Sequence, residues 1–447
     1  QDMLRYYLRP FEACVAAGSA GMMCSYNMVN GVPTCADGTI NNEFYRARLG
    51  WEGFIVSDCG AITDMFSGHH FSPDLASAAG AALRGGCDTA CDTAYDRLPQ
   101  ALQQRAISTH DLDTAAMRIL REQIRQGELD EPRFNPYKWY PPWLVDSPQH
   151  RALAVETAQQ AITLLVNKDE LLPLGAADAS SIAFIGPHAN TSLGMLGNYF
   201  GGNKVVYQQT PLLAARRAGM TVEYAAGVPC WDVSHGDTTY PLCDTENTKD
   251  RSHVDAAVRA ARRARTVVLF LGNGAVNNSG PCAAMDGVEG EGCDRGSIEL
   301  PESQRSLLWH VSLANRRVVV VLINGGAIAM PSHPHVAALL EAYYPGEMAG
   351  EAIVNVLWGK SDRIFGRLPY MVPQASFTRE RDFRDMSMRG GCGITHQWYK
   401  RKPQFPFGFG LSYTTFAFTL VSAPTLHLPA TPGASVTIAC VVANTGG

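Results

Sequence analysis

Short apolar runs that alternate with helical patterns constrain the fold of this chain more than any other feature. The runs Thr266–Leu271 and Val318–Ile323 are almost continuously aliphatic, and a Gly and an Asn follow each of them. Such runs are typical of strands buried on both faces, as in parallel sheets covered by helices. The helical patterns Val254–Arg265 and Pro301–Ala314 precede and separate the two runs. We therefore expect a βα repeat with its loops at the carboxyl ends of the strands, where ligands gather.

The repeat extends over residues 149–373, which we assign to one α/β domain. Its further expected elements are a helix at Gln149–Leu164 and strands at Ser181–Ile185 and Ala337–Ala342. A connecting segment follows at 374–404. From residue 405 the pattern changes to the period-two alternation of strands, so we predict an all-β module at 405–447.

Residues 1–130 carry a similar but shorter series. Apolar runs at Met22–Tyr26 and Phe54–Asp58 end in polar residues, and a helical pattern covers Ala76–Arg84. This rhythm is that of a (β/α)8 barrel, but only two or three units are present, too few to close one. The Pro- and aromatic-rich segment 131–148 is expected to be a linker that lies on a surface.

Composition and charge exclude several classes of protein. The 447 residues include 37 Lys and Arg against 42 Asp and Glu, a formal charge of −5 without any basic cluster. Nucleic acid is therefore not an expected partner. No uninterrupted apolar stretch approaches the roughly 18 residues of a membrane span. There is no phosphate-binding loop and no Gly-x-Ser-x-Gly motif, and we expect no cofactor.

The cysteines indicate an oxidising compartment. Twelve are present, and eight of them flank short loops rich in Gly, Pro, Asn or Asp, where a disulfide restrains a segment without its own core. Free or metal-binding thiols are the alternative, but no Cys-x-x-Cys or Cys/His set with zinc spacing occurs, so no metal is expected. Two glycosylation sequons, at Asn190 and Asn277, agree with secretion. The candidate disulfide pairs are Cys24/Cys35, Cys87/Cys91, Cys230/Cys243 and Cys282/Cys293.

Asp58 is the first candidate for chemistry. It ends the apolar run Gly53–Ser57, so its carboxylate is expected at the carboxyl end of a buried strand, which is the catalytic face of a barrel. The alternative from position alone is an N-cap of the following helix.

A second candidate is the Gly-rich segment Gly287–Arg295. It places Glu289 and Glu291 two positions apart, and crowding of two carboxylates raises the pKa of one of them, as a general acid requires. A solvated acidic loop or a calcium site is the alternative. Asp294 and Arg295 are expected to form an ion pair that holds the loop.

Taken together, these segments resemble glycoside hydrolase family 3, and within it the secreted β-xylosidase-like branch. The resemblance rests on ordered motifs that cover nearly the whole chain. They are Met23–Cys35 (MCSYNMVNGVPTC), Trp51–Cys59 (WEGFIVSDC), Glu289–Arg295 (EGEGCDR), Tyr344–Ile353 (YPGEMAGEAI), Gly366–Pro369 (GRLP) and Phe407–Phe416 (FGFGLSYTTF).

The resemblance implies a barrel domain, an α/β sandwich domain and a fibronectin-III-like domain, with the site between the first two. It also implies a retaining exo-acting β-glycosidase of oligosaccharides or polysaccharides, most simply a β-xylosidase. Asp58 matches the nucleophile, and Glu291 is favoured over Glu289 as acid/base because relatives more often carry that residue in a Glu-Gly-x-Asp-Arg context. Met23 and Tyr26 match positions that line the sugar subsite. Cys59 stands where glucosidase-like members tend to carry Trp, which implies a smaller pocket.

The resemblance further implies that the family barrel begins before Gln1 and that the fibronectin-like module is incomplete. We therefore expect the chain to need the remaining barrel segment, in the same or another chain, for stability. A non-hydrolytic glycan-binding or structural relative is the alternative to an enzyme, because fold alone does not fix function. A β-glucosidase or α-arabinofuranosidase is the alternative specificity.

Overall fold

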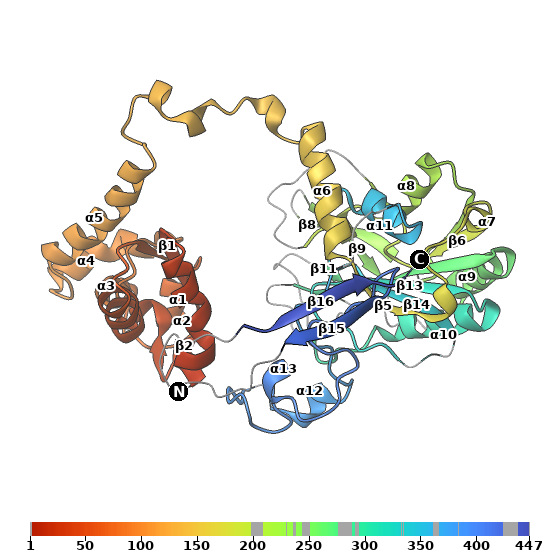
Figure 1. Cartoon of the computed structure of the whole chain (residues 1–447). Helices are drawn as coiled ribbons and strands as arrows, with labels where there is room; N and C mark the ends of the chain where they lie inside the picture. Colours follow the sequence, from red (N-terminus) through yellow and green to blue (C-terminus); the bar gives the residue numbers. More distant parts are fainter. Residues whose placement is uncertain are drawn as a thin grey trace. The chain divides into compact units, whose positions relative to one another are not determined.

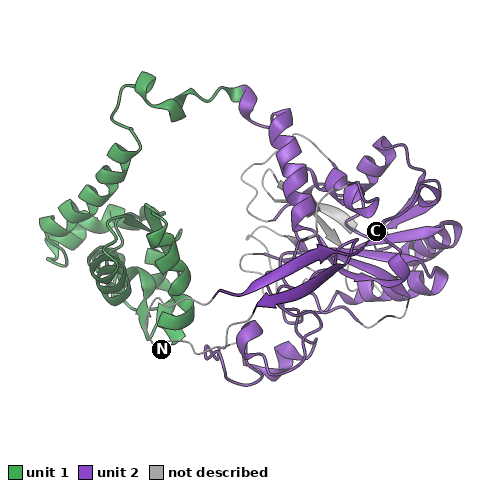
Figure 2. Ribbon diagram, in the orientation of Figure 1, with its two compact units in different colours: residues 1–142 green, residues 143–447 purple. Residues whose placement is uncertain are grey.

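A computed structural model of the chain describes two compact units, residues 1–142 and 143–447 (Figure 2). The division between them falls inside the segment 131–148 that the sequence predicts as a linker. The described residues are 2–197, 209–228, 230–235, 238–243, 251–275, 288–290, 295–331, 333, 335–360, 366–382, 384–422 and 437–446. Side chains are described in all of these ranges except at 230–235, 238–243, 275 and 288.

The first unit is built on short parallel strands followed by helices (Figure 1). Strand β1 (Gly21–Cys24) pairs with β4 (Phe54–Ser57), with Met22 opposite Ile55, and Val56 forms a further parallel bridge with Thr89. This is the βα series that the sequence predicts. Its helices include α1 (Arg9–Ala16), α2 (Ala61–Ser67), α3 (Leu75–Gly85), α4 (Leu98–Gln103) and α5 (Thr109–Arg125). The short elements are β2 (Met28–Val29), β3 (Val32–Pro33), π-helices at Met3–Tyr7 and Thr39–Arg48, and 3-10 turns at Thr34–Ala36, Thr93–Arg97, Pro132–Phe134, Pro136–Trp139 and, across the boundary between the units, Pro142–Leu144.

A buried carboxylate ties the elements of this unit together. Asp88 is 5% exposed and accepts hydrogen bonds from Arg46 (2.7 Å) and Arg118 (2.8 Å), which come from the π-helix Thr39–Arg48 and from α5. It also accepts the backbone N–H of Ile55 in β4 at 2.8 Å. Removal of one partner from a buried ion pair costs about 3–5 kcal/mol, so Asp88 fixes the position of β4 and of the residues at its end.

A six-stranded sheet forms the centre of the second unit (Figure 1). Five strands are parallel and β5, at one edge, is antiparallel to its neighbour. The order is β5 (Thr163–Asn167), β14 (Val336–Glu341), β13 (Val318–Ile323), β10 (Thr266–Gly272), β6 (Ile182–Ile185) and β7 (Val222–Ala225). Every residue of β10, β13 and β6 is buried, as the aliphatic runs predict.

Two apolar layers lie on the two faces of this sheet. Successive residues of β6 alternate between them: Phe184 packs in the layer with α11 (Ala349–Leu357) and α8 (Pro211–Arg217). Ile185 packs in the layer with α9 (Ser252–Arg263) and α10 (Glu302–Ala314). The sheet is therefore covered by helices on both sides, as in other parallel sheets.

The remaining described elements connect or extend the sheet. They are α6 (Pro148–Ala161), α7 (Ala176–Ala179), α12 (Phe377–Glu380), α13 (Thr395–Trp398), the hairpin β8 (Cys230–His235) and β9 (Thr238–Cys243), the pair β11 (Gly274–Ala275) and β12 (Val288–Glu289), 3-10 turns at Lys168–Glu170 and Leu193–Met195, and the antiparallel pair β15 (Phe416–Ser422) and β16 (Ala439–Asn444). The last pair agrees with the strand alternation predicted after residue 405. Among the helices of the described ranges, none is both long and apolar enough to cross a membrane.

Two edges of the sheet differ from the sequence-based expectation. The helix predicted at Gln149–Leu164 ends at Ala161, and β5 begins at Thr163 because Leu164 pairs with Leu340 of β14. A short apolar run fits either a helix or a strand, and here the pairing partner decides. Strand β7 was not predicted, since its sequence Val-Glu-Tyr-Ala carries little apolar periodicity.

Phe270→Ala tests whether the double-sided core holds the second unit. The Phe270 ring is fully buried, 5.0 Å from the ring of Phe184 between their centroids. Its removal is expected to lower the free energy of unfolding by about 3–5 kcal/mol, measured by denaturant titration of the complete natural polypeptide that contains this sequence. The control Leu313→Ala shortens a side chain on α10 that is 59% exposed and should change it by less than about 0.5 kcal/mol. Equal effects of the two substitutions would contradict the described core.

Candidate active site

Asp58 lies at the carboxyl end of β4, as the sequence predicts. Its backbone N–H donates to the carbonyl of Cys24 at 2.9 Å, which continues the ladder between β1 and β4. The half-buried carboxylate accepts the Cys59 N–H through Oδ1 at 2.8 Å. Gly60 stands at the N-cap of α2 without a side-chain cap, so Asp58 does not serve as the N-cap. Its carboxylate therefore faces a partly open strand end in a fixed orientation.

Tyr26 and Met23 lie on the neighbouring strand and its exit. The Tyr26 hydroxyl donates to the carbonyl of Cys59, and the Tyr26 carbonyl lies 2.7 Å from Nε2 of His69. Met23 is opposite Val56 in the register of β1 and β4, and its side chain is 57% exposed. Four residues that the sequence singles out, Met23, Tyr26, Asp58 and Cys59, thus gather at one end of this strand pair.

The disulfide pattern corrects one sequence-based prediction. Cys24 is bonded to Cys35, the pairing that the spacing predicts, but Cys91 is bonded to Cys59 and the predicted pair Cys87/Cys91 is wrong. The reason is tertiary: the Cys91 N–H donates to Ser57 Oγ at 3.0 Å, which brings Cys91 beside the end of β4. The residue after Asp58 is therefore half of a disulfide and not a free thiol.

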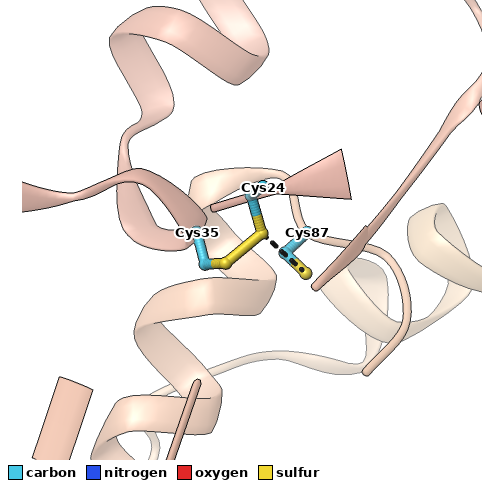
Figure 3. Close-up of side chains that lie close together, drawn as sticks. All are labelled: Cys24, Cys35 and Cys87. Atoms are coloured by element: carbon cyan, nitrogen blue, oxygen red, sulfur yellow. Dashed lines mark hydrogen bonds between the residues drawn. A yellow bond between two sulfur atoms is a disulfide. The ribbon is translucent and has the colours of Figure 1, made fainter. Parts of the chain in front are cut away.

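Cys87 keeps a buried thiol next to the other disulfide (Figure 3). Its Sγ lies 3.7 Å from Sγ of Cys24, and the thiol donates to the carbonyl of Thr89 at 3.4 Å. The sulfur atoms of Cys24, Cys35 and Cys87 all lie within 4.8 Å of one another. A metal would need thiolates, but two of these sulfurs are bonded to each other and burial raises the pKa of Cys87 to about 12. The cluster is thus a disulfide with a packed thiol.

Other predicted residues are described in part or not at all. Cys230 and Cys243 are opposite partners in the β8–β9 ladder, although their side chains lie outside the described residues. Asn190 is exposed and its Oδ1 accepts from Thr210. Five predicted residues lie outside the described ranges: Asn277, Cys282, Glu291, Cys293 and Asp294.

Glu289, the second acid/base candidate, is the centre of a buried polar network. It lies in β12, which pairs in parallel with β11, and is 9% exposed. Its Oε1 accepts from the Tyr344 hydroxyl at 2.8 Å and from the backbone N–H of Gly325. Its Oε2 accepts from Asn273 Nδ2 at 3.2 Å and lies 3.2 Å from Nε of Arg295. In the described residues Arg295 thus pairs with Glu289, while its predicted partner Asp294 is not described.

Buried polar residues at the carboxyl ends of neighbouring strands extend the network. Asn273, Asn324 and Glu341 end or follow β10, β13 and β14, and each is at most 1% exposed. Glu341 accepts from the backbone N–H of Tyr343 at 3.2 Å and lies 3.4 Å from Nδ2 of Asn324. Burial raises the pKa of Glu341 to about 8, and the charge of Glu289 adds to this rise. Glu341 is therefore mostly protonated at neutral pH.

Sequence reasoning missed four members of this network: Asn273, Asn324, Tyr344 as a hydrogen-bond donor, and Glu341. The available signal was positional, because Asn324 and Glu341 stand where the aliphatic runs of β13 and β14 end. The Gly325-Gly326 pair, which lacks the pattern of a dinucleotide site, here lies against Glu289 and Arg295.

Glu341→Gln tests the buried protonated carboxyl through the pH dependence of stability. The pKa of Glu341 is about 8 in the fold against an ordinary value of 4.5. Between these pH values the unfolded chain releases the proton while the fold retains it, so the stability of the native protein falls as pH rises. Relative to Glu341→Gln, it should fall by up to about 1.4 kcal/mol per pH unit between about pH 5 and 8, measured by denaturant titration at each pH. The exposed control Glu351→Gln should leave the native pH dependence in place. Parallel curves for the native protein and Glu341→Gln would contradict this assignment.

Comparison with known proteins identifies the family. A model of the glycosyl hydrolase family 3 C-terminal domain matches residues 162–413, and one of the glycosyl hydrolase family 3 N terminal domain matches residues 1–122. Among curated relatives, a probable exo-1,4-beta-xylosidase bxlB of Aspergillus fumigatus is 36% identical over 470 residues, which covers 100% of this chain and 56% of that protein. Beta-D-xylosidase 1 of Arabidopsis thaliana is 33% identical over 96% of this chain and 52% of its own length.

Solved structures agree with the sequence comparison. A GH3 exo-beta-xylosidase (XlnD) in complex with a xylobiose aziridine activity based probe matches with a TM-score of 0.81 and 30% identity, over 94% of this chain and 52% of that one. A b-glucosidase from Erythrobacter marinus matches with a TM-score of 0.72 and 27% identity, over 92% of this chain and 55% of that one. The chain thus spans about half the length of these proteins. Because the C-terminal domain model alone matches more than half of the chain, this protein belongs to glycosyl hydrolase family 3.

Proposed function

We propose that the protein containing this chain is a retaining exo-acting β-glycosidase that releases terminal xylose from xylo-oligosaccharides, with Asp58 as the nucleophile. The arrangement at the end of β4 is the main support. A half-buried carboxylate with one oxygen held by the Cys59 N–H lies beside the accessible side chains of Met23 and Tyr26. A nucleophile must keep its orientation while one side stays open to the sugar, and this arrangement provides both.

The reaction needs two carboxyl groups with different tasks. In a retaining glycosidase one carboxylate attacks the anomeric carbon while a carboxylic acid protonates the departing oxygen. The same second group then acts as a base for water, which hydrolyses the glycosyl ester. Asp58 suits the first task, because its Oδ1 accepts a backbone N–H and the side chain is ordered without a cationic partner in the described residues.

Glu291 is proposed as the acid/base. The proposal rests on its sequence context, Glu291-Gly-Cys-Asp294-Arg295, which matches the family motif. The described contacts of Glu289 support the choice indirectly: four donors already engage the two oxygens of its carboxylate. A group so engaged is poorly placed to carry a proton to a substrate.

Xylose is the proposed sugar because both curated relatives cited above, and the cited structure with the higher identity, are named xylosidases. The Cys59–Cys91 disulfide fits this choice, since it occupies the position where a bulkier Trp is expected in glucosidase-like members. Two disulfides in the described residues are also compatible with an extracellular enzyme, which is the location we propose.

Asp58→Ala tests the proposed nucleophile. The complete natural polypeptide should hydrolyse aryl β-xylosides faster than aryl β-glucosides and release the β-anomer first, as followed by NMR. Asp58→Ala should lower kcat by roughly 10³-fold or more, since no other group forms the glycosyl ester. The control Asp113→Asn changes an exposed carboxylate of the same unit and should retain activity.

Three results would overturn the proposal. Release of the inverted anomer, or an undiminished rate in Asp58→Ala, would remove Asp58 from the nucleophile role. A well-folded polypeptide that cleaves no glycoside would favour the non-hydrolytic alternative. A higher rate on glucosides would keep the mechanism and change the sugar.

A further inference from the structure

The Glu289 carboxylate contacts four groups of the second unit, more than an exposed carboxylate usually contacts. They come from distinct parts of the second unit: Asn273 follows β10, Gly325 follows β13, Tyr344 follows β14, and Arg295 lies beyond β12 in sequence. One carboxylate thus joins the ends of three adjacent parallel strands to the short strand β12.

We propose that Glu289 is a positioning residue, whose carboxylate fastens β12 to the carboxyl ends of β10 and β13 and so fixes the backbone two residues before Glu291 in the sequence. This inference rests on the glycosidase function proposed above. The inference gives the two neighbouring carboxylates different roles: Glu289 holds the backbone, and Glu291 exchanges a proton.

The backbone around Glu289 is shaped to admit its carboxylate. A Cβ on Gly325 would lie 3.0 Å from Oε1 of Glu289 and 2.8 Å from the ring of Tyr344. A Cβ on Gly326 would lie 2.7 Å from Nη2 of Arg295. A glycine at position 325 is therefore required for this close approach, whereas a Cβ on Gly326 would displace only the end of the Arg295 side chain.

The groups around Glu289 act as hydrogen-bond donors. The guanidinium of Arg295 and the backbone N–H of Gly325 can only donate. Burial raises the pKa of Tyr344 well above its ordinary value, and the charge of Glu289 adds to the rise, so its hydroxyl remains a donor. All of these groups donate to the Glu289 carboxylate, so its oxygens are engaged as acceptors, whereas the acid step needs a donor.

Unpaired polar atoms beside Glu289 indicate more than a stability role. In the described part of the chain, Asn273 Oδ1, Arg295 Nη1 and Asn324 Oδ1 are buried without a hydrogen-bond partner. Each such atom destabilises the fold, because it loses its hydrogen bonds to water on burial. Asn273 and Arg295 contact Glu289, and Asn324 contacts Glu341. A network selected for stability alone would pair these atoms, so their presence is expected where the geometry serves a site.

The test compares Glu289→Gln with Glu291→Ala in the complete natural polypeptide. Aryl β-xylosides with leaving groups of different acidity are hydrolysed over a range of pH, with and without sodium azide. In Glu291→Ala the acid/base is absent, so azide should attack the anomeric carbon of the xylosyl–Asp58 ester. The carbon–oxygen bond to Asp58 then breaks, and β-xylosyl azide forms as the carboxylate of Asp58 is regenerated. The basic limb of the pH profile should vanish in this variant.

Glu289→Gln should behave differently. Its kcat should fall about 10–100-fold, more for poor leaving groups, while the basic limb of the pH profile remains and no xylosyl azide forms. Tyr344→Phe, which removes one donor to the same oxygen, should show a smaller loss of the same kind and covers the case that Glu289→Gln fails to fold. The exposed Glu302→Gln is the matched control and should have native kinetics.

The outcomes separate the two proposals. Formation of xylosyl azide by a Glu289 variant, together with loss of its basic limb, would make Glu289 the acid/base and overturn the positioning role while the glycosidase function stands. Native kinetics in both Glu289→Gln and Tyr344→Phe would also overturn it. If the native polypeptide cleaves no glycoside, the proposed function fails and the positioning role fails with it.

Discussion

The parallel pairing of β10 with β13 and β6, in a sheet buried on both faces, is the constraint on which the second unit depends. Because helices cover both faces, every residue of these strands must be apolar or fully hydrogen-bonded, and the aliphatic runs meet this demand. Polar groups can then stand only where the strands end. These positions are occupied by Asn273, Asn324 and Glu341. Asn273 donates a hydrogen bond to Glu289, and Asn324 donates one to Glu341.

The same rule shapes the first unit on a smaller scale. Asp58 follows β4 directly, while Asp88 anchors β4 through Arg46, Arg118 and the Ile55 N–H. Two carboxylates of the same type therefore differ in role because of their surroundings. Asp88 is buried between two guanidinium groups and holds the fold, whereas Asp58 is half-exposed and accepts a backbone N–H among the described residues, which suits the nucleophile role proposed above.

The surroundings of Glu341, Glu289 and Asp58 show how burial and hydrogen-bond partners give carboxyl groups different properties. Glu341, buried with few donors, holds its proton at neutral pH because desolvation penalises the charge. Glu289, also buried but met by a guanidinium and three further donors, is held as an acceptor. Asp58 is more exposed than either glutamate and accepts a backbone N–H. In a family 3 glycosidase such differences decide which carboxyl attacks, which transfers a proton and which only holds its neighbours in place.

The sequence by itself determined the elements and the places where function gathers. Aliphatic runs specified the central strands, because apolar periodicity is a local property, and the strand-end position of Asp58 followed from the run before it. Tertiary structure alone decided which partners meet. Leu164 lies in a strand because it pairs with β14. Cys91 is bonded to Cys59 and not to Cys87 because it lies beside the end of β4. Glu289 accepts hydrogen bonds from Tyr344 and Gly325, each more than thirty residues away in the sequence. Such pairings depend on distances between segments remote in sequence, and no local pattern of residues encodes those distances.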